Sequence, residues 1–454
     1  MPLSAHVDSA IRIPRALLTD TQRTALDARL SYPNPAYEAV SKRFSRRMQI
    51  PPRLTTLREE AFDLVVPRGA IAAVRDLGIA LEPRQLSLPP VGFAFEGELR
   101  DYQEAAVLAA FGAEQGVIVA PCGSGKTTIA LALIARCDQP ALVLVGSLDL
   151  LEQWTERVRA HLGVEASRCA EGRMEIGNVT IATVQSARDP ARLAALRDRF
   201  GLVLLDECHH TPAQTFADLV SAFPARFRFG VTATPTRADG LETLTGHYLG
   251  PVAHTVATSE LVDAGHLVRP TYVTVPTDFE FRYAGPTDWH PLLEALVASP
   301  ERNRLIVETI AADCASGVVG LALTGRVAHA EHLRDLLAAR GLRVAALTSS
   351  ASKAERADAL ERAREGAIDV IVATQLADEG LDVPRLARMY LCFPGRSETR
   401  LLQRIGRIMR PHADKVVPEV KDFVDARVGV LANQAQKRAQ AFASLWGASL
   451  GAAA

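Results

Sequence analysis

The sequence predicts an α/β protein in which a small N-terminal domain is followed by two lobes, each built on a parallel sheet. From about residue 116 onward, short runs that are apolar on both faces alternate with amphipathic helical stretches, which is typical of sheets covered by helices. The runs fall into two sets, with a more mixed stretch over about 258–286 between them. The first set comprises 116–120, 141–145 and 201–205, and the second comprises 318–323, 344–347, 369–373 and 389–393. Two tandem lobes are therefore expected.

The domain boundaries follow from changes in composition. The region before residue 93 lacks the regular alternation of apolar runs and helical stretches. It ends in the Pro-rich stretch 88–92, which is typical of a domain boundary. A chain of 454 residues is long enough for two or three domains. We expect an accessory domain, a first lobe, a second lobe and a C-terminal helix with its tail, at 1–92, 93–267, 268–430 and 431–454.

The bulk composition excludes several classes of protein. Apolar residues make up 48% of the chain, which is ample for hydrophobic cores and argues against extended disorder. The net charge is −1, so any surface that binds nucleic acid must be local. The six cysteines form no close pair, which predicts a reducing compartment, without a disulfide framework or a zinc site. No secretory signal is visible and the longest apolar stretch is too short to cross a bilayer, so we expect a cytoplasmic protein with no membrane partner.

A phosphate-binding loop follows the first apolar run. Residues 120–127 read Ala-Pro-Cys-Gly-Ser-Gly-Lys-Thr, between a predicted buried strand and a predicted helix, which is the context of a P-loop. Lys126 would place a cation between the β- and γ-phosphates of ATP, and Thr127 would offer a hydroxyl to Mg²⁺. The glycines let backbone amides face the phosphates. The loop residues expected to bind the nucleotide are Gly123, Ser124, Gly125, Lys126, Thr127 and Thr128.

An acidic pair supplies the second half of an ATP-hydrolysing site. Asp206 follows the run 201–205 and so comes at the carboxyl end of a strand, where it can hold Mg²⁺ through water. Glu207 can orient or deprotonate the attacking water. The residues that follow, 208–210, are Cys-His-His without a second ligand pair, so no metal other than Mg²⁺ is expected.

Four further motifs narrow the class of ATPase. Residues 99–103 read Leu-Arg-Asp-Tyr-Gln, residues 231–240 begin Val-Thr-Ala-Thr-Pro, residues 373–384 contain Asp-Glu-Gly-Leu-Asp, and residues 403–410 read Gln-Arg-Ile-Gly-Arg-Ile-Met-Arg. In order and spacing, the set resembles the motifs of superfamily 2 helicases, with a DECH variant of the DEAD/DEAH box. It is most similar to the XPB-like and type III restriction motor branch. The resemblance covers about 95–425 and implies two RecA-like lobes that hydrolyse ATP between them.

The resemblance also implies roles for single residues around the nucleotide. Arg100 and Gln103 match an element that reads adenine, and Gly380 and Asp382 match positions that face the nucleotide. The second lobe's catalytic contribution to the γ-phosphate matches Gln403, Arg407 and Arg410. An arginine finger of this kind is worth about 10³–10⁵ in rate. The alternative is that Arg404, Arg407 and Arg410, spaced three apart, only solvate a helix face.

Other positions match contacts with the backbone of nucleic acid. These are Ser147, Thr183 and Thr374, although the usual Pro-Thr start of the first motif is Gly-Ser here. Thr232 and Thr234 match the element that couples hydrolysis to lobe movement. We expect Trp154 to be a core residue and not a platform for base stacking.

The N-terminal region carries one acid-free basic segment. Every charged residue from 42 to 58 is basic, and Asn34 with Pro35 resembles the start of a helix that would contain part of this segment. Either Lys42, Arg43, Arg46 and Arg47 contact phosphates, or they are a solvated face; both readings stay open.

The sequence favours an ATP-dependent DNA helicase or translocase that acts on single-stranded or forked DNA. An RNA helicase is the alternative within the class. A scaffold with a decayed ATP site is disfavoured because the expected catalytic residues are intact, namely Lys126, Asp206, Glu207, Arg407 and Arg410. A third alternative is the motor subunit of a restriction-type assembly, in which a partner nuclease would supply cleavage because the chain has no recognisable nuclease motif.

Overall fold

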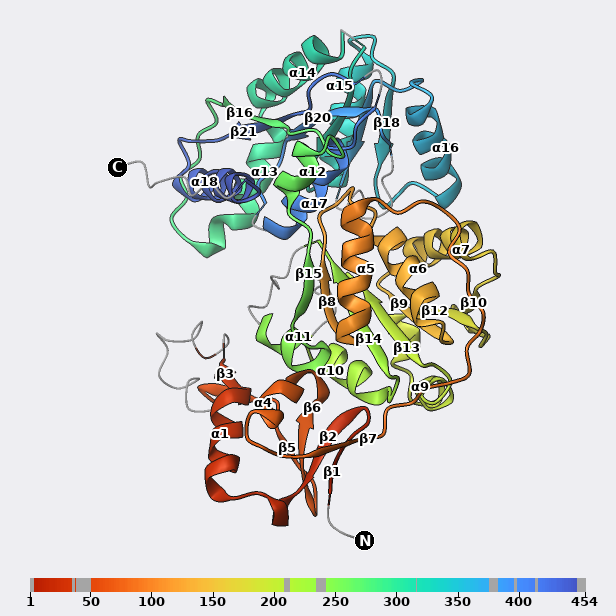
Figure 1. Cartoon of the computed structure of the whole chain (residues 1–454). Coiled ribbons are helices and arrows are strands. Elements are labelled where there is room, and N and C mark those ends of the chain that lie inside the picture. The colour runs from red at the N-terminus through yellow and green to blue at the C-terminus, as the bar shows by residue number, and fades with distance from the viewer. Residues whose placement is uncertain are drawn as a thin grey trace. The chain divides into compact units, whose positions relative to one another are not determined.

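The computed structural model (Figure 1) describes most of the 454 residues in two compact units. The first unit comprises Met1–Pro121 and Gly125–Val256, and the second comprises Cys122–Ser124 and Ala257–Ala454. The described residues are 4–34, 37, 50–207, 213–233, 242–315, 317–374, 383–395, 398–412 and 415–446.

The chain begins with a five-stranded sheet that has its own core. The strand order is β5-β6-β2-β1-β7. Apolar residues alternate along β1 and β2 and pack with Leu26 and Leu30 of α1 and with Val74 of α4. Helix α1 begins after Thr19, whose hydroxyl accepts from Gln22 N while the Gln22 side chain caps Thr19 N. The elements are β1 (Ala5–Val7), β2 (Ala10–Pro14), η1 (Arg15–Leu17), α1 (Asp20–Leu30), β5 (Arg58–Glu59), β6 (Asp63–Pro67), η2 (Arg68–Ala70), α4 (Ile71–Arg75) and β7 (Leu81–Pro83).

Two short strands, β3 (Ser31–Pro33) and β4 (Arg53–Thr55), pair with each other beside this sheet. The chain between them contains the basic segment. Lys42, Arg43, Arg46 and Arg47, with most of the helix predicted from Asn34, lie outside the described residues.

The first lobe is an eight-stranded sheet in the order β11-β10-β12-β9-β13-β14-β8-β15. Its strands are parallel except β11. The three apolar runs predicted as strands are β8, β9 and β13, and β9 is buried along its whole length. The strands are β8 (Gln115–Val119), β9 (Ala141–Val145), β10 (Ser167–Ala170), β11 (Arg173–Met174), β12 (Val179–Thr183), β13 (Leu202–Asp206), β14 (Phe227–Thr232) and β15 (Val252–Thr255). The helices are α5 (Asp101–Ala113), α6 (Lys126–Cys137), α7 (Leu148–Leu162), α8 (Val184–Ala187), α9 (Pro190–Leu196), α10 (Ala213–Ala222) and α11 (Glu242–Leu249).

The N-terminal sheet is fixed to the first lobe through a buried arginine. Arg68 is 2% exposed and donates to the carbonyl oxygens of Ala225 and Arg226, just before β14, and to Gln115 Oε1 at 2.7 Å. Gly69 lies against α11, where an added Cβ would come within 2.5 Å of the Gly246 carbonyl oxygen. The contact therefore requires glycine at position 69 and a long cation at position 68.

The second unit is built on a six-stranded parallel sheet in the order β16-β21-β20-β17-β19-β18. All four predicted runs of the second set are strands, whereas β16 and β21 were not predicted. The strands are β16 (Thr271–Pro276), β17 (Val319–Leu323), β18 (Val344–Leu347), β19 (Val370–Ala373), β20 (Leu386–Leu391) and β21 (Glu419–Val424). The helices are α12 (Thr258–Asp263), α13 (Trp289–Ala298), α14 (Pro300–Cys314), α15 (Val327–Ala338), α16 (Lys353–Arg364), α17 (Glu398–Ile408) and α18 (Gly429–Ser444).

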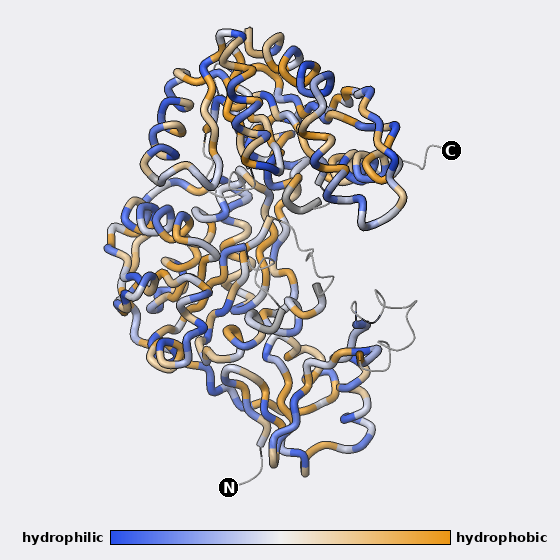
Figure 2. Tube along the Cα trace, turned by 180° about the vertical axis from the view of Figure 1, so that it is seen from behind, coloured by the Kyte–Doolittle hydropathy of each residue, from blue (hydrophilic) through white to orange (hydrophobic). Residues whose placement is uncertain are grey.

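Two buried ion pairs anchor helices of this unit. Arg302 of α14 contacts Asp425 at 2.8 Å, and Arg438 of the C-terminal helix α18 contacts Asp422 of β21 at the same distance. The interior strands are hydrophobic in both units (Figure 2). Across the part of the chain that the structure describes, no helix is both long and apolar enough to span a bilayer.

Candidate active site

The predicted residues of the first lobe meet at one edge of its sheet. The carboxyl ends of adjacent strands carry, in spatial order, Thr183 on β12, Ser147 after β9, Asp206 on β13, Thr232 on β14 and the P-loop after β8. Because these strands are parallel, all five positions share one edge, which is where ligands bind in such sheets. Asp206 lies between the two predicted phosphate contacts of nucleic acid and the predicted ATP loop.

The P-loop has the backbone that a phosphate cradle requires. Gly123 and Gly125 have φ of +88° and +79°, a region that favours glycine. Helix α6 begins at Lys126, so the amides of its first turn, including those of Thr127 and Thr128, have no partner from a preceding turn of helix.

The predicted adenine-reading element lies against this loop. An added Cβ at Gly125 would come within 2.5 Å of Gln103 Nε2, so glycine is required there. Gln103 is buried at the start of α5, and its Oε1 accepts from the backbone N–H of Arg100 at 3.0 Å. The structure thus brings Arg100, Gln103 and the P-loop together.

Lys126 and Glu207 form an ion pair at the centre of the site. Lys126 Nζ lies 3.3 Å from Glu207 Oε1, with the two side chains 13% and 20% exposed. The other carboxylate oxygen of Glu207 accepts from Ala233 N at 3.4 Å, just after β14. Glu207 has φ +47°, a strained conformation for a residue with a side chain, of the kind that concentrates at functional sites.

Asp206 has a partner that the sequence did not reveal. The indole N–H of Trp154 donates to Asp206 Oδ2 at 2.8 Å. Trp154 is 2% exposed, so the prediction that it is a core residue is confirmed, but it also contacts the acid of the site. Burial raises the pKa of Asp206, and the neighbouring charge of Glu207 raises it further, while Trp154 and Lys126 act in the opposite direction. A buried indole N–H needs an acceptor, so a tryptophan predicted in the core was itself a signal to search for one.

The donors at this edge suit Mg²⁺. Thr127 and Asp206 would offer it a hydroxyl and a carboxylate, the hard oxygen ligands that this ion prefers. Within the described ranges, no group of three or more His, Cys, Asp or Glu residues could hold a metal alone. Mg²⁺ bound through one carboxylate and the oxygens of a nucleotide needs no such group.

Ser147 and Thr183 both cap helices at this edge. Ser147 Oγ accepts from Leu150 N at 3.3 Å at the start of α7, and Thr183 Oγ1 accepts from Ser186 N at 3.2 Å at the start of α8. Thr183 ends β12 and Ser147 follows the neighbouring strand β9, whose last residue, Val145, pairs with Thr183. Each hydroxyl oxygen acts as an acceptor in its cap, and a hydroxyl also has a hydrogen to donate.

In the second unit, Thr374 follows β19 and is 8% exposed, with its N–H donating to Leu347 O at 3.2 Å. Helix α17 has an apolar side with Leu401, Ile405 and Ile408, and the predicted catalytic Gln403 on this helix is also buried. The arginines at 404, 407 and 410 are all partly buried. Gly380, Asp382 and Thr234 lie outside the described residues.

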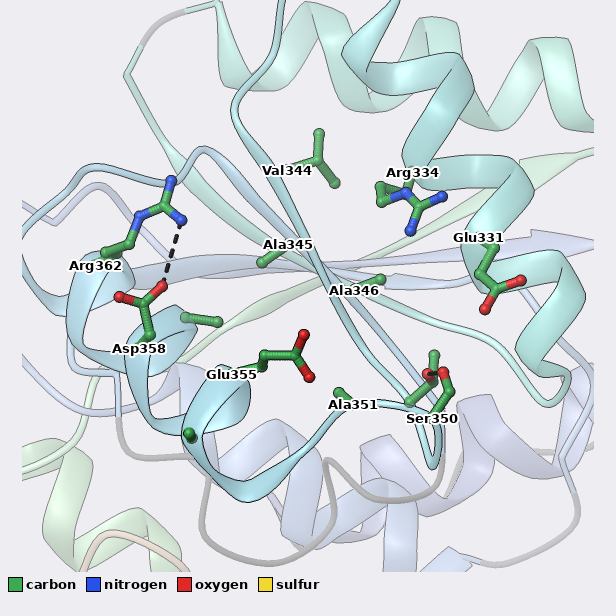
Figure 3. A pocket seen from close by; sticks show the side chains of 13 residues that line it. Glu331, Arg334, Val344, Ala345, Ala346, Ser350, Ala351, Glu355, Asp358 and Arg362 are labelled. Atoms are coloured by element: carbon green, nitrogen blue, oxygen red, sulfur yellow. Dashed lines mark hydrogen bonds and ion pairs between the residues drawn. The ribbon is translucent and has the colours of Figure 1, made fainter.

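A cavity of about 580 Å³ in the second unit lies between α15, β18 and α16 (Figure 3). Glu331, Arg334, Glu355, Asp358 and Arg362 are among its lining residues, and Arg362 pairs with Asp358 at 3.5 Å. None of the predicted site residues lines it, so its volume gives it no role in the chemistry described above.

Comparison with known proteins agrees with the motifs. Residues 96–237 match the family model of the type III restriction enzyme res subunit, and residues 305–412 match the helicase conserved C-terminal domain. The chain is 28% identical to the DNA 3'-5' translocase XPB2 of Sulfurisphaera tokodaii, across 69% of this chain and 79% of the relative. It is 29% identical to the DNA 3'-5' helicase XPB of Mycobacterium tuberculosis, across 72% of this chain but 60% of the relative.

A solved structure shares the fold. A fragment described as the HsdR subunit of a type I restriction enzyme from Vibrio vulnificus superposes with a TM-score of 0.60 at 21% identity, across 79% of this chain and 68% of that one.

Proposed function

The chain belongs to superfamily 2 of the helicases, close to the XPB branch, and on this premise we propose that it is an ATP-dependent DNA translocase or helicase. The observation that carries the proposal is the arrangement of Lys126, Glu207 and Asp206 beside the P-loop, at the sheet edge that also holds Ser147 and Thr183. The same edge of the sheet would thus bind both ATP and the nucleic acid along which the protein moves.

Four residues of the first lobe would have separate roles in ATP hydrolysis. Lys126 would exchange its ion pair with Glu207 for the β- and γ-phosphates when ATP binds. Glu207, released from Lys126 and still near Ala233 N, would orient the attacking water and accept its proton. Mg²⁺, held by Thr127 and Asp206, would neutralise charge on the phosphates.

The second lobe would complete the site. Gln403, Arg407 and Arg410 of the α17 region are the groups that we assign to the γ-phosphate, and Gly380 and Asp382 those that would face the rest of the nucleotide. Because these residues belong to another lobe than Lys126, hydrolysis would require the lobes to close and could drive movement. The two lobes themselves are assigned to 93–267 and 268–430.

DNA would lie along the phosphate contacts. Ser147, Thr183 and Thr374 would hold its backbone, which accounts for tracking but not for recognition of sequence. Single-stranded or forked DNA is the substrate that we assign to them. The motif residues themselves do not exclude RNA.

One comparison tests the proposal. The steady-state ATPase rate of the full chain is measured without nucleic acid and with saturating single-stranded DNA, duplex DNA or RNA. We expect at least tenfold stimulation by DNA and much less by RNA. Stimulation by RNA alone would replace the proposal with an RNA helicase, and ATP turnover indifferent to all three would refute it.

A further inference from the structure

Trp154 connects the body of the first lobe to the acid of the ATP site. It lies on α7, the helix that follows β9, and its N–H reaches Asp206 on the adjacent strand β13. The 2.8 Å contact therefore joins two chain segments that are 52 residues apart. It has a length typical of a good hydrogen bond.

The indole has little freedom to leave this position. Leu151, Val158 and Leu162, spaced at three, four and four residues on α7, are buried with Trp154 on one face of the helix. The ring itself is among the largest fully buried side chains of the chain. Its orientation is thus fixed by packing, before any ligand binds.

The chemistry of the indole suits a carboxylate that must stay ionised. Its N–H can only donate, so it favours an oxygen that is not carrying a proton. The hydrogen bond to Oδ2 therefore holds the Asp206 carboxylate through a donor whose own position is fixed by the packing of α7. Groups that hold a metal-binding carboxylate from behind commonly change metal affinity or activity by about 10–100-fold when removed.

We infer that Trp154 is a positioning residue for the metal-binding carboxylate of Asp206, and thus tunes how tightly the site takes up Mg²⁺ with its nucleotide. The inference rests on the proposed function, because it uses Asp206 as the acid that holds the metal. The inference adds Trp154, from the middle of helix α7, to the residues that form the ATP site.

The first test replaces the donor and keeps the ring. Trp154→Phe removes the N–H while it preserves most of the packing. Val158→Ala, on the same buried face of α7, removes packing without touching Asp206. We expect the Mg²⁺ concentration for half-maximal ATPase to rise by about tenfold in Trp154→Phe and by less than twofold in Val158→Ala.

The second readout does not depend on turnover. The chain has three tryptophans, so replacement of Trp289 and Trp446 by Phe leaves Trp154 as the only one. Addition of Mg²⁺ in the presence of ADP should then change the emission of Trp154, because its carboxylate partner is engaged. This measurement also decides the matter if Trp154→Phe does not fold.

The outcomes separate this inference from the proposed function. A wild-type chain without Mg²⁺-dependent ATPase would remove the proposed function itself. An active wild type, with a folded Trp154→Phe that needs no more Mg²⁺ than Val158→Ala, would overturn the inference. The inference would also be overturned if the fluorescence emission of Trp154 did not change when Mg²⁺ and ADP are added together.

Discussion

The most informative single contact is the ion pair between Lys126 and Glu207. Once ATP is present, Lys126 would bind the phosphates and Glu207 would orient the attacking water. A partly buried lysine that neutralises the acid is positioned to exchange it for phosphate. The pair therefore predicts different consequences for the loss of each end.

Lys126→Ala should abolish ATPase activity, since no other cation of the loop would hold the β- and γ-phosphates. Glu207→Gln should keep ATP bound and lower turnover by at least about 10². Turnover by coupled assay and binding of a fluorescent ATP analogue check both. Arg136→Gln, at an exposed position in the last turn of the same helix, is the control and should stay near wild type. A Lys126→Ala protein that turns over at the wild-type rate would remove the ATP site from this loop.

Residue-level predictions from sequence worked where a motif specifies a local turn. The P-loop glycines and the strand-end Asp206 are found where their flanking patterns placed them. Trp154 and Arg68 could not be predicted in these roles. Asp206 lies 52 residues from Trp154, and the carbonyl oxygens of Ala225 and Arg226 lie more than 150 residues from Arg68, so only the packed fold brings those groups together.

At the scale of elements, strands were predictable when both faces are apolar. All seven predicted runs are strands, and six of them lie inside a sheet, where a parallel strand contacts helices on either side; the seventh, β18, is a half-buried edge strand. Strands β16 and β21 are not apolar on both faces, for different reasons, and so could not be predicted in this way. β16 is an edge strand that is largely exposed, and β21 carries Asp422, a buried charge that Arg438 and Tyr272 bind.

Helix α18 should owe its place to that buried charge. Arg438→Ala would leave Asp422 with only the Tyr272 hydroxyl, which donates to it at 2.6 Å. Removal of one partner of a buried pair costs about 3–5 kcal/mol, so the free energy of unfolding of this unit should fall by that amount. Replacement of both, as Asp422→Asn with Arg438→Met, should cost less. Urea unfolding of the full chain measures both, and equal costs for the single and the double variant would contradict the pairing.

Helix α15 predicts a dependence on pH through His329. Its ring is 2% exposed, with Nδ1 bound to Thr324 Oγ1 at 2.7 Å and Nε2 to Asn303 Oδ1 at 3.0 Å. Burial lowers the pKa of His329 to about 3, and the nearby charges of Arg302 and His332 act in the same direction. Between this value and the ordinary 6.5, the unfolded chain binds a proton that the folded chain does not, so stability falls as pH drops below 6.5.

The matched variant is His329→Gln, which keeps a polar group but does not titrate. As pH falls from 6 to 4, the stability advantage of the wild type over this variant should shrink by up to about 1.4 kcal/mol per pH unit. Urea unfolding at several pH values, followed by tryptophan fluorescence, gives the difference. An advantage that stays constant with pH would mean that His329 takes up its proton in the folded state.

At the scale of the whole molecule, the N-terminal sheet and the first lobe act as one body. Arg68 and Gly69 fix the sheet to the start of β14 and to α11. A second contact lies directly after β4, where Thr56 Oγ1 is 3.0 Å from His247 Nδ1 of α11. Whatever the N-terminal domain binds is therefore attached directly to the lobe that carries the P-loop.

Strands β3 and β4 lie close to this contact, on either side of residues 34–52 in the sequence. Asn34, just after β3, donates to the carbonyl oxygens of Pro51 and Pro52, just before β4, at 2.8 and 3.0 Å. Tyr32 of β3 also packs its ring edge against His247, with centroids 6.1 Å apart. In the sequence, the four cations at 42, 43, 46 and 47 lie between these two strands.

If these cations contact DNA phosphates, their removal should change the salt dependence of binding and leave the chemistry alone. Lys42, Arg43, Arg46 and Arg47 changed together to Gln should weaken DNA binding. The slope of log affinity against log salt should flatten by about 0.7 per lost contact on a single strand, or about 0.9 on duplex, because fewer counterions are released. The ATPase rate without DNA should stay within twofold of the wild-type rate, since Lys126 and Glu207 are untouched.

Arg12, Arg15, Arg23 and Arg29, four cations of the same domain, form the control set for Gln replacement. Titration of a fluorescent oligonucleotide at several salt concentrations decides the matter, because a solvated face that never meets DNA leaves the slope of the basic-segment variant equal to that of the wild type.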